Sequence, residues 1–330
     1  MHCVISRGTV SPILLTFDAP ASGIYYTSYC MIIEKPFIEN LELLARQVVE
    51  GFIIGLHKSP FHGFSVEFAE HRLYNPGDPL RHIDWRVYGR TDKLFIKRFE
   101  EETNLRCCIV IDTSPSMQFP RDEKKLNKLQ FSCVAAASLL QLLKRQLDAS
   151  SLVLFDEQVN YFSQCRSANS HYRMLTNELQ KVVNYSSENK ATNTAAALHV
   201  VAEQMHKRSL VVIFSDMMDD TESIESLFSA LQHLRYNKHE VILFHVMDGA
   251  LEIGFEFENR PYEFVDMETG DRIKLQPQQI KEQYISRMAE FRKQVEDRCH
   301  QYQVDRVEVY LSKPVDQVLH SFLMKRNKLM

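Results

Sequence analysis

RCCIVIDTSPSM, at residues 106–117, carries the pattern from which the architecture of the chain can be predicted. Residues 108–111 form a short apolar run, Asp112 opens a polar loop, and a helical pattern begins at about residue 125. This order predicts a buried strand, a loop and a helix. The carboxylate of Asp112 is followed at two-residue intervals by the hydroxyls of Ser114 and Ser116. Oxygen ligands of this kind supply half of a site for a hard cation.

After residue 106 apolar strands alternate with amphipathic helices. Strands with unbroken apolar runs are covered on both faces, so they belong to a mainly parallel, doubly wound α/β sheet of the Rossmann type. Residues 159–162 are expected to pair at the edge of this sheet. The expected strands are 108–111, 152–155, 210–214, 241–247 and 305–311, and the expected helices are 125–147, 172–183, 194–206, 222–234 and 280–299, with a last helix after Pro314.

Three regions follow from the change in pattern along the chain. Residues 1–34 show no sustained period and are expected to be an irregular N-terminal extension. Two alternatives stay open for this extension. It is an arm of the protein, or it is read from an upstream start codon and Met31 is the real first residue. Residues 35–105 are expected to hold a short helix at 38–49 and a small β-rich arm. Residues 106–330 form the expected α/β domain.

Composition limits the classes of function. The chain has 330 residues, 45% hydrophobic content and a formal net charge of −4, which argues against a general affinity for nucleic acid. Its seven cysteines form no CxxC pair, so free thiols in a reducing compartment are expected. No apolar run approaches the ~18 residues that span a bilayer. We therefore expect a cytoplasmic protein without a transmembrane segment.

The second half of the site is expected at another strand end. Asp216 closes the strand 210–214 as Asp112 closes its own, and parallel strands of an open sheet end at one crevice. Thr192 opens the helix between them, although Thr194 is an alternative ligand. Hydroxyl and carboxylate oxygens suit Mg²⁺, with Mn²⁺ or Ca²⁺ as alternatives, and a carboxylate from a partner would complete the shell. The predicted metal ligands are Asp112, Ser114, Ser116, Thr192 and Asp216.

Two motifs resemble known families. The set Asp112-x-Ser114-x-Ser116, then Thr192, then Asp216 resembles the metal-ion-dependent adhesion site of von Willebrand factor A domains. An upstream set resembles the signature of the bacterial domain of unknown function 58 family, which couples such an arm to an A-type domain. That set is Gly63-Phe64-Ser65-x-Glu67-Phe68, Arg72-x-Tyr74-x-Pro76-Gly77-Asp78-x-x-Arg81-x-Ile83-Asp84-Trp85 and Arg90-Thr91.

The resemblance implies a function without catalysis. Members of the family are commonly encoded beside MoxR-type AAA+ ATPases, which are proposed to assemble or activate client proteins together with A-domain partners. We expect a metal-dependent protein-interaction module, not an enzyme, that works with such an ATPase or its client. The sequence contains no glycine-rich phosphate loop, no GxGxxG and no GxSxG motif. A metal-dependent phosphate-ester hydrolase and a metal-free scaffold that binds through the arm remain alternatives.

Each motif also has a purely structural interpretation. Ser114 or Ser116 alone is more often a helix cap than a ligand. Asp216, with further acidic residues close behind it, also fits a solvated turn. Basic and aromatic residues interleave in the arm, but the acidic residues among them favour internal ion pairs around Trp85 over a nucleic-acid surface. Its four histidines lack metal-ligand spacing.

Overall fold

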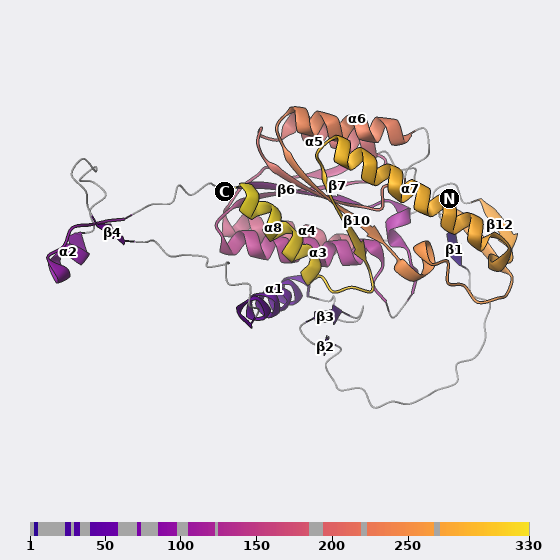
Figure 1. The fold of residues 1–330 in the computed structure, drawn as a ribbon, viewed down its shortest axis with the longest axis horizontal. Coiled ribbons are helices and arrows are strands. Elements are labelled where there is room, and N and C mark those ends of the chain that lie inside the picture. The colour runs from indigo at the N-terminus through magenta and orange to yellow at the C-terminus, as the bar shows by residue number, and fades with distance from the viewer. Residues whose placement is uncertain are drawn as a thin grey trace. The chain divides into compact units, whose positions relative to one another are not determined.

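The fold is known from a computed structural model (Figure 1). It describes residues 3–5, 24–27, 30–33, 40–58, 71–73, 85–97, 105–122, 125–184, 194–218, 223–266 and 271–329. Contacts divide the chain into two compact units, Met1–Phe52 with Leu105–Met330, and Ile53–Asn104. The first unit contains the α/β sheet and the second contains the arm.

A six-stranded sheet forms the centre of the first unit, in the order β13-β10-β9-β6-β7-β8. Every neighbouring pair is parallel except the edge pair of β7 and β8. This confirms the mainly parallel α/β sheet and the edge position of residues 159–162, whose antiparallel direction the sequence did not indicate. The strands are β6 (Arg106–Asp112), β7 (Ala149–Phe155), β8 (Val159–Phe162), β9 (Leu210–Ser215), β10 (Glu240–Met247) and β13 (Asp305–Tyr310).

Helices cover both faces of this sheet (Figure 1). One face carries α5 (Thr194–Gln204), α6 (Ser223–Tyr236) and α7 (Pro277–Gln301), and the other carries α3 (Lys128–Arg145), α4 (Asn169–Val183) and α8 (Asp316–Leu329). Because both faces are covered, every residue of β9 is buried, as are all residues of β6 except Arg106. The continuous apolar runs in the sequence are the direct consequence of this burial.

Helix α3 is buried on all sides. Fifteen of its 18 residues are buried, including polar ones. The helix begins with a capping box, in which the Asn127 side chain accepts from the Gln130 backbone N–H and the Gln130 side chain accepts from the Asn127 N–H. This cap fixes the position of the first helical residue, Lys128, under the carboxyl ends of the sheet strands.

A second, smaller sheet has three antiparallel strands. These are β1 (Cys3–Ile5), β11 (Tyr262–Asp266) and β12 (Arg272–Leu275), in the order β1-β11-β12. β11 and β12 follow each other in the chain and pair as a hairpin, whose turn lies outside the described residues. Phe255, Tyr262 and Phe264 form a buried cluster at this sheet.

Two short helical segments lie in loops that follow strands of the main sheet. The 3₁₀ segment η3 (Pro115–Gln118) comes after β6, and the π segment η4 (Gly249–Ile253) comes after β10. Both loops leave the carboxyl ends of parallel strands, so they lie at the edge where the site is expected.

The N-terminal residues differ from the expectation of irregular chain. Besides β1, they form the antiparallel pair β2 (Ile24–Thr27) and β3 (Cys30–Ile33). These strands are only three or four residues long, too short to produce a period in the sequence. Helix α1 extends over Leu41–Lys58, longer than the expected 38–49, and its first part packs in the first unit through Leu41 N–H, which donates to Gln180 Oε1.

The arm is described only in part. Strands β4 (His71–Leu73) and β5 (Phe95–Lys97) pair antiparallel, and α2 (Trp85–Thr91) is a helix where a loop was expected. Residues 64–68, which alternate as a strand would, and the side-chain surroundings of Trp85 lie outside the described residues. The β character of the arm is therefore seen in one two-stranded pair.

Two further expectations concern thiols and membranes. Five cysteines whose side chains the structure describes are free thiols: Cys107, Cys108, Cys133, Cys165 and Cys299. In the described part of the chain, no helix has both the length and the apolarity needed to cross a bilayer.

Candidate cation site

The predicted carboxylates end two neighbouring central strands. Counting the parallel strands in chain order, the sheet runs 2-1-3-4-5, and the order reverses between the first strand, β6, and the third, β9. Open α/β sheets bind ligands at this switch point, outside the carboxyl ends of the strands. Asp112 is the last residue of β6, and Asp216 directly follows β9. Ile111 pairs with Phe214, so the two acidic residues leave adjacent strands at the same edge.

Asp112 is buried and held by two hydrogen bonds. Its Oδ1 accepts from the Ser114 backbone N–H at 2.9 Å, and its Oδ2 accepts from the Ser215 hydroxyl at 2.8 Å. Thr113 beside it donates both its N–H and its hydroxyl to the Phe155 carbonyl of β7. The loop after β6 is thus fixed to the ends of both neighbouring strands, which orients the Asp112 carboxylate.

The two serine hydroxyls lie side by side. Ser114 Oγ and Ser116 Oγ form a hydrogen bond of 3.0 Å, in which either hydroxyl can donate, and both side chains are buried. Ser114 occupies the N-cap position of η3, yet its side chain makes no capping hydrogen bond. The helix-cap interpretation therefore does not hold for Ser114.

Asp216 is buried, so it is not part of a solvated turn. Its Oδ2 accepts from Lys128 Nζ at 2.7 Å, and its Oδ1 accepts from the Met218 N–H at 3.2 Å. The next residue, Met217, has a left-handed backbone with φ of 54°, which costs free energy for a residue with a Cβ. The tight turn keeps the Asp216 carbonyl close to the sheet, where His245 Nε2–H donates to it at 2.9 Å.

Lys128 is a residue that the sequence analysis missed. Its side chain is 0% exposed, and its ammonium bridges Asp216 and Glu252, with 2.5 Å to Glu252 Oε1. Burial alone would lower the pKa of Lys128, but the two carboxylates more than offset burial and raise the pKa. Burial raises the pKa of Glu252, although Lys128 opposes this effect. A lysine in the first turn of a helix is unfavourable next to the helix dipole, and this was the available sequence signal.

Behind Asp216 lies a second group of charged side chains. His245 is fully buried, and its pKa is lowered to about 4 by burial and by the nearby Arg306 guanidinium, so its ring is neutral at pH 7. The guanidinium of Arg306 donates to His245 Nδ1 at 2.9 Å, which fixes the proton on Nε2. Arg306 and Arg292 both pair with Glu308 of β13. This group positions the turn after β9.

The side chains of the two threonine candidates lie outside the described residues. Thr192 lies outside the described residues, and Thr194 begins α5 with a side chain that is also outside them. The other four predicted ligands lie at one edge of the sheet. Whether a metal occupies the set stays a prediction.

The arrangement fits a small divalent cation. Two oxygens in adjacent positions of an octahedron with bonds of about 2.1 Å are about 3 Å apart, and the serine hydroxyls have this separation. Among the described residues, no three His, Cys, Asp or Glu side chains form a group that could hold a metal ion.

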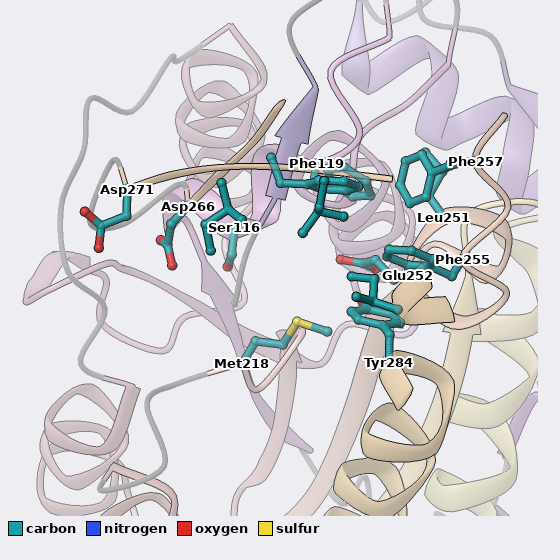
Figure 2. A pocket seen from close by; sticks show the side chains of 14 residues that line it. Ser116, Phe119, Met218, Leu251, Glu252, Phe255, Phe257, Asp266, Asp271 and Tyr284 are labelled. Carbon is teal, nitrogen blue, oxygen red and sulfur yellow. The ribbon is translucent and has the colours of Figure 1, made fainter. Parts of the chain in front are cut away.

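A cavity opens beside Ser116 (Figure 2). Ser116 and Glu252 belong to its wall, so it borders both the hydroxyl pair and the Lys128 ion pair. The remaining wall consists mainly of apolar and aromatic side chains from η4, β11, β12 and α7.

Comparisons with known proteins identify the family. The model of a family described as "Protein of unknown function DUF58" matches residues 70–294. Uncharacterised proteins of Mycobacterium tuberculosis and Mycobacterium bovis are 23% identical over 211 residues, which is 64% of this chain and 64% of each relative. The chain thus spans somewhat less than two thirds of the length of these curated relatives.

Two solved structures with low sequence identity are also similar in part. The conserved hypothetical protein BatB of Bacteroides thetaiotaomicron is 15% identical with a TM-score of 0.43, covering 68% of this chain and 99% of that one. The PilB minor pilin of Streptococcus sanguinis is 8% identical with a TM-score of 0.38, covering 72% of this chain and 64% of that one.

Proposed function

Because the chain belongs to the DUF58 family, whose description states no activity, we propose a function from its site: a non-catalytic, metal-dependent protein-interaction module with an A-type domain like that of von Willebrand factor. The proposal rests on one observation. Two buried serine hydroxyls lie 3.0 Å apart beside an oriented carboxylate, at the switch point of the sheet.

Each residue has a separate role in this proposal. Ser114 and Ser116 would hold Mg²⁺ directly, with Mn²⁺ or Ca²⁺ as alternatives, and Thr192 is the proposed third hydroxyl. Asp112 and Asp216, both engaged in hydrogen bonds to the protein, would act through water. When bound, the ion supplies an electrophilic position for an oxygen ligand from outside the chain.

The proposed partner presents a carboxylate to that position. The resemblance to proteins encoded beside MoxR-type AAA+ ATPases makes such an ATPase, or its client, the candidate partner. Lys128 has a supporting role here, because its ammonium neutralises part of the buried negative charge and holds Asp216 in one orientation. The proposed location is the cytoplasm, where such ATPases work.

Calorimetric titration with MgCl₂ tests the ion. We expect heat of binding for the wild type, and loss of that heat in Ser114→Ala and in Ser116→Ala. Ser138→Ala is the matched control, since Ser138 is also a buried serine but donates to the Val134 carbonyl within α3. Binding that is unchanged in both site variants would contradict the proposed ligands.

Recovery of partners from lysate tests the function. We expect wild-type protein and Ser138→Ala to retain a partner in Mg²⁺, and to lose it in EDTA, whereas Ser114→Ala fails in both. If EDTA leaves the recovery of the partner unchanged, the result supports the metal-free scaffold as the function instead. Turnover of a generic phosphate ester by the wild type and not by Asp112→Ala would assign a hydrolase.

A further inference from the structure

Two histidines face each other where helices α5 and α6 pack together. His199 lies in the middle of α5 and His233 in the last turn of α6, on the same face of the main sheet (Figure 1). Their Nδ1 atoms are 3.0 Å apart, and the ring planes meet at 44°. Among the described residues, neither ring has another hydrogen-bond partner. Two neutral imidazoles make such a contact when one Nδ1 carries the proton and the other accepts it.

The separation of the two nitrogens also suits a chelated metal ion. Imidazole nitrogens bind late first-row transition metals with bonds of about 2.1 Å. Two such ligands at right angles, as in the square-planar or octahedral sites of Ni²⁺ and Cu²⁺, are about 3.0 Å apart. A tetrahedral ion requires about 3.4 Å. The measured 3.0 Å between the Nδ1 atoms of His199 and His233 therefore matches the right-angle geometry.

The protons balance when an ion enters between the rings. The proton on one Nδ1 moves to Nε2 of the same ring, so both Nδ1 lone pairs are available to the ion and the rings stay neutral. Both side chains are only partly buried, which leaves positions for water in the coordination shell. Among the described residues, no third His, Cys, Asp or Glu side chain joins the pair as a ligand. With two protein ligands and water, the ion is exchangeable.

We propose that His199 and His233 form a site for a divalent transition-metal ion with right-angle coordination, of the class of Ni²⁺ and Cu²⁺. The bound ion links α5 to α6, two helices that are joined in the chain through β9. The site offers nitrogen ligands, whereas the candidate cation site offers oxygen ligands, so the two select different ions. This proposal therefore does not rest on the proposed function.

Calorimetric titration of the untagged full chain with NiCl₂ tests the site, with excess MgCl₂ present to saturate the candidate cation site. We expect one tight Ni²⁺ site in the wild type. Affinity should fall at least about tenfold in His199→Gln and in His233→Gln, because a second ligand held in place acts at high effective concentration. His300→Gln is the matched control, since His300 is an exposed histidine on α7, and it should bind Ni²⁺ as the wild type does.

A second measurement uses the wild type alone, so it does not depend on how the variants fold. In ¹⁵N spectra of the histidine rings, paramagnetic Ni²⁺ should broaden the signals of His199 and His233 at lower concentrations than that of His300. Thermal unfolding gives a further readout. NiCl₂ should raise the unfolding midpoint of the wild type and of His300→Gln more than that of His199→Gln, because the ion binds only the folded pair.

Two results would overturn the proposal. One is equal Ni²⁺ affinity of the wild type and both site variants, which would leave the pair as a hydrogen bond between neutral rings. The other is broadening of His300 at the same Ni²⁺ concentration as His199 and His233, which would indicate binding to any accessible histidine. Loss of Mg²⁺ binding in the titration described above changes neither result, so the two proposals fail separately.

Discussion

A single buried lysine joins the candidate cation site to the cavity. Lys128 pairs with Asp216, a predicted site residue, and with Glu252, which lines the cavity. Charges that are buried without a partner cost several kcal/mol, whereas a buried ion pair with good geometry roughly balances its own desolvation. The ion pairs of Lys128 therefore add little net stability. Removing Lys128, however, would leave two buried carboxylates without a cation.

We predict that Lys128→Met destabilises the protein by about 3–5 kcal/mol, because two carboxylates stay buried without their cation. Urea unfolding followed by circular dichroism measures this. Lys181→Met, which breaks the exposed pair with Glu178, is the matched control and should change the unfolding free energy little. Adding Glu252→Gln to Lys128→Met should restore part of the loss. Equal stability of the two single variants would show that the Lys128 pairs are not maintained in solution.

Among the elements, β13 pairs with β10 through the backbone and is linked to α7 by one carboxylate. Glu308 accepts hydrogen bonds from Arg292 of α7, from Arg306 of its own strand and from the Tyr310 hydroxyl. Burial alone would raise the pKa of Glu308, but these donors and the two guanidinium charges lower it to about 2. Arg306 in turn reaches His245, so α7, β13 and β10 share one polar group.

This shift predicts a dependence of stability on pH. Because the folded pKa of about 2 lies below the ordinary 4.5, ionised Glu308 stabilises the fold fully above about pH 4.5. That contribution is lost as the pH falls from 4.5 towards 2. The difference in unfolding free energy between wild type and Glu308→Gln should therefore be constant from pH 7 to 5 and shrink below that. Exposed Glu290→Gln on α7 is the control. A difference that does not change with pH would contradict the role given to the ionised form.

At the scale of the whole first unit, two hydrophobic clusters are separate. The larger lies between the main sheet and helices α5, α6 and α7, and includes Val211, Ile213 and Leu243. The smaller consists of Phe255, Tyr262 and Phe264, with partly buried neighbours that include Tyr284. Strands β11 and β12 depend on the smaller cluster, and β12 has no buried residue.

Because the two hydrophobic clusters are separate, we expect the two sheets to open to solvent in separate events. Amides of β6 and β9 should exchange with solvent only on global unfolding, whereas amides of β11 and β12 should exchange through a local opening of lower free energy. Native-state hydrogen exchange with increasing denaturant measures both. A common opening free energy for the two sheets would show one cooperative unit. Since residues of the smaller cluster line the cavity, such local opening would also expose it.

Much of the fold followed from local pattern. The buried runs at 108–111 and 210–214 predicted central parallel strands, and helices such as 125–147 were placed within a few residues. Helix α7 buries only Pro277, Val295 and Cys299 of its 25 residues. The first half of that helix lies against the smaller sheet, an environment that periodicity does not reveal. Helix α2 was missed because seven residues are too few for a reliable period.

By itself, the sequence determined that Asp112 and Asp216 end neighbouring buried strands, because the order of apolar runs and polar loops is a local property. Only the tertiary structure decided that Lys128 lies between Asp216 and Glu252, which are 88 and 124 residues away from it in the chain. The same is true of the cavity, whose wall combines η3, η4, β11, β12 and α7. Contacts over such separations depend on how elements pack, and packing is a property of the folded chain as a whole.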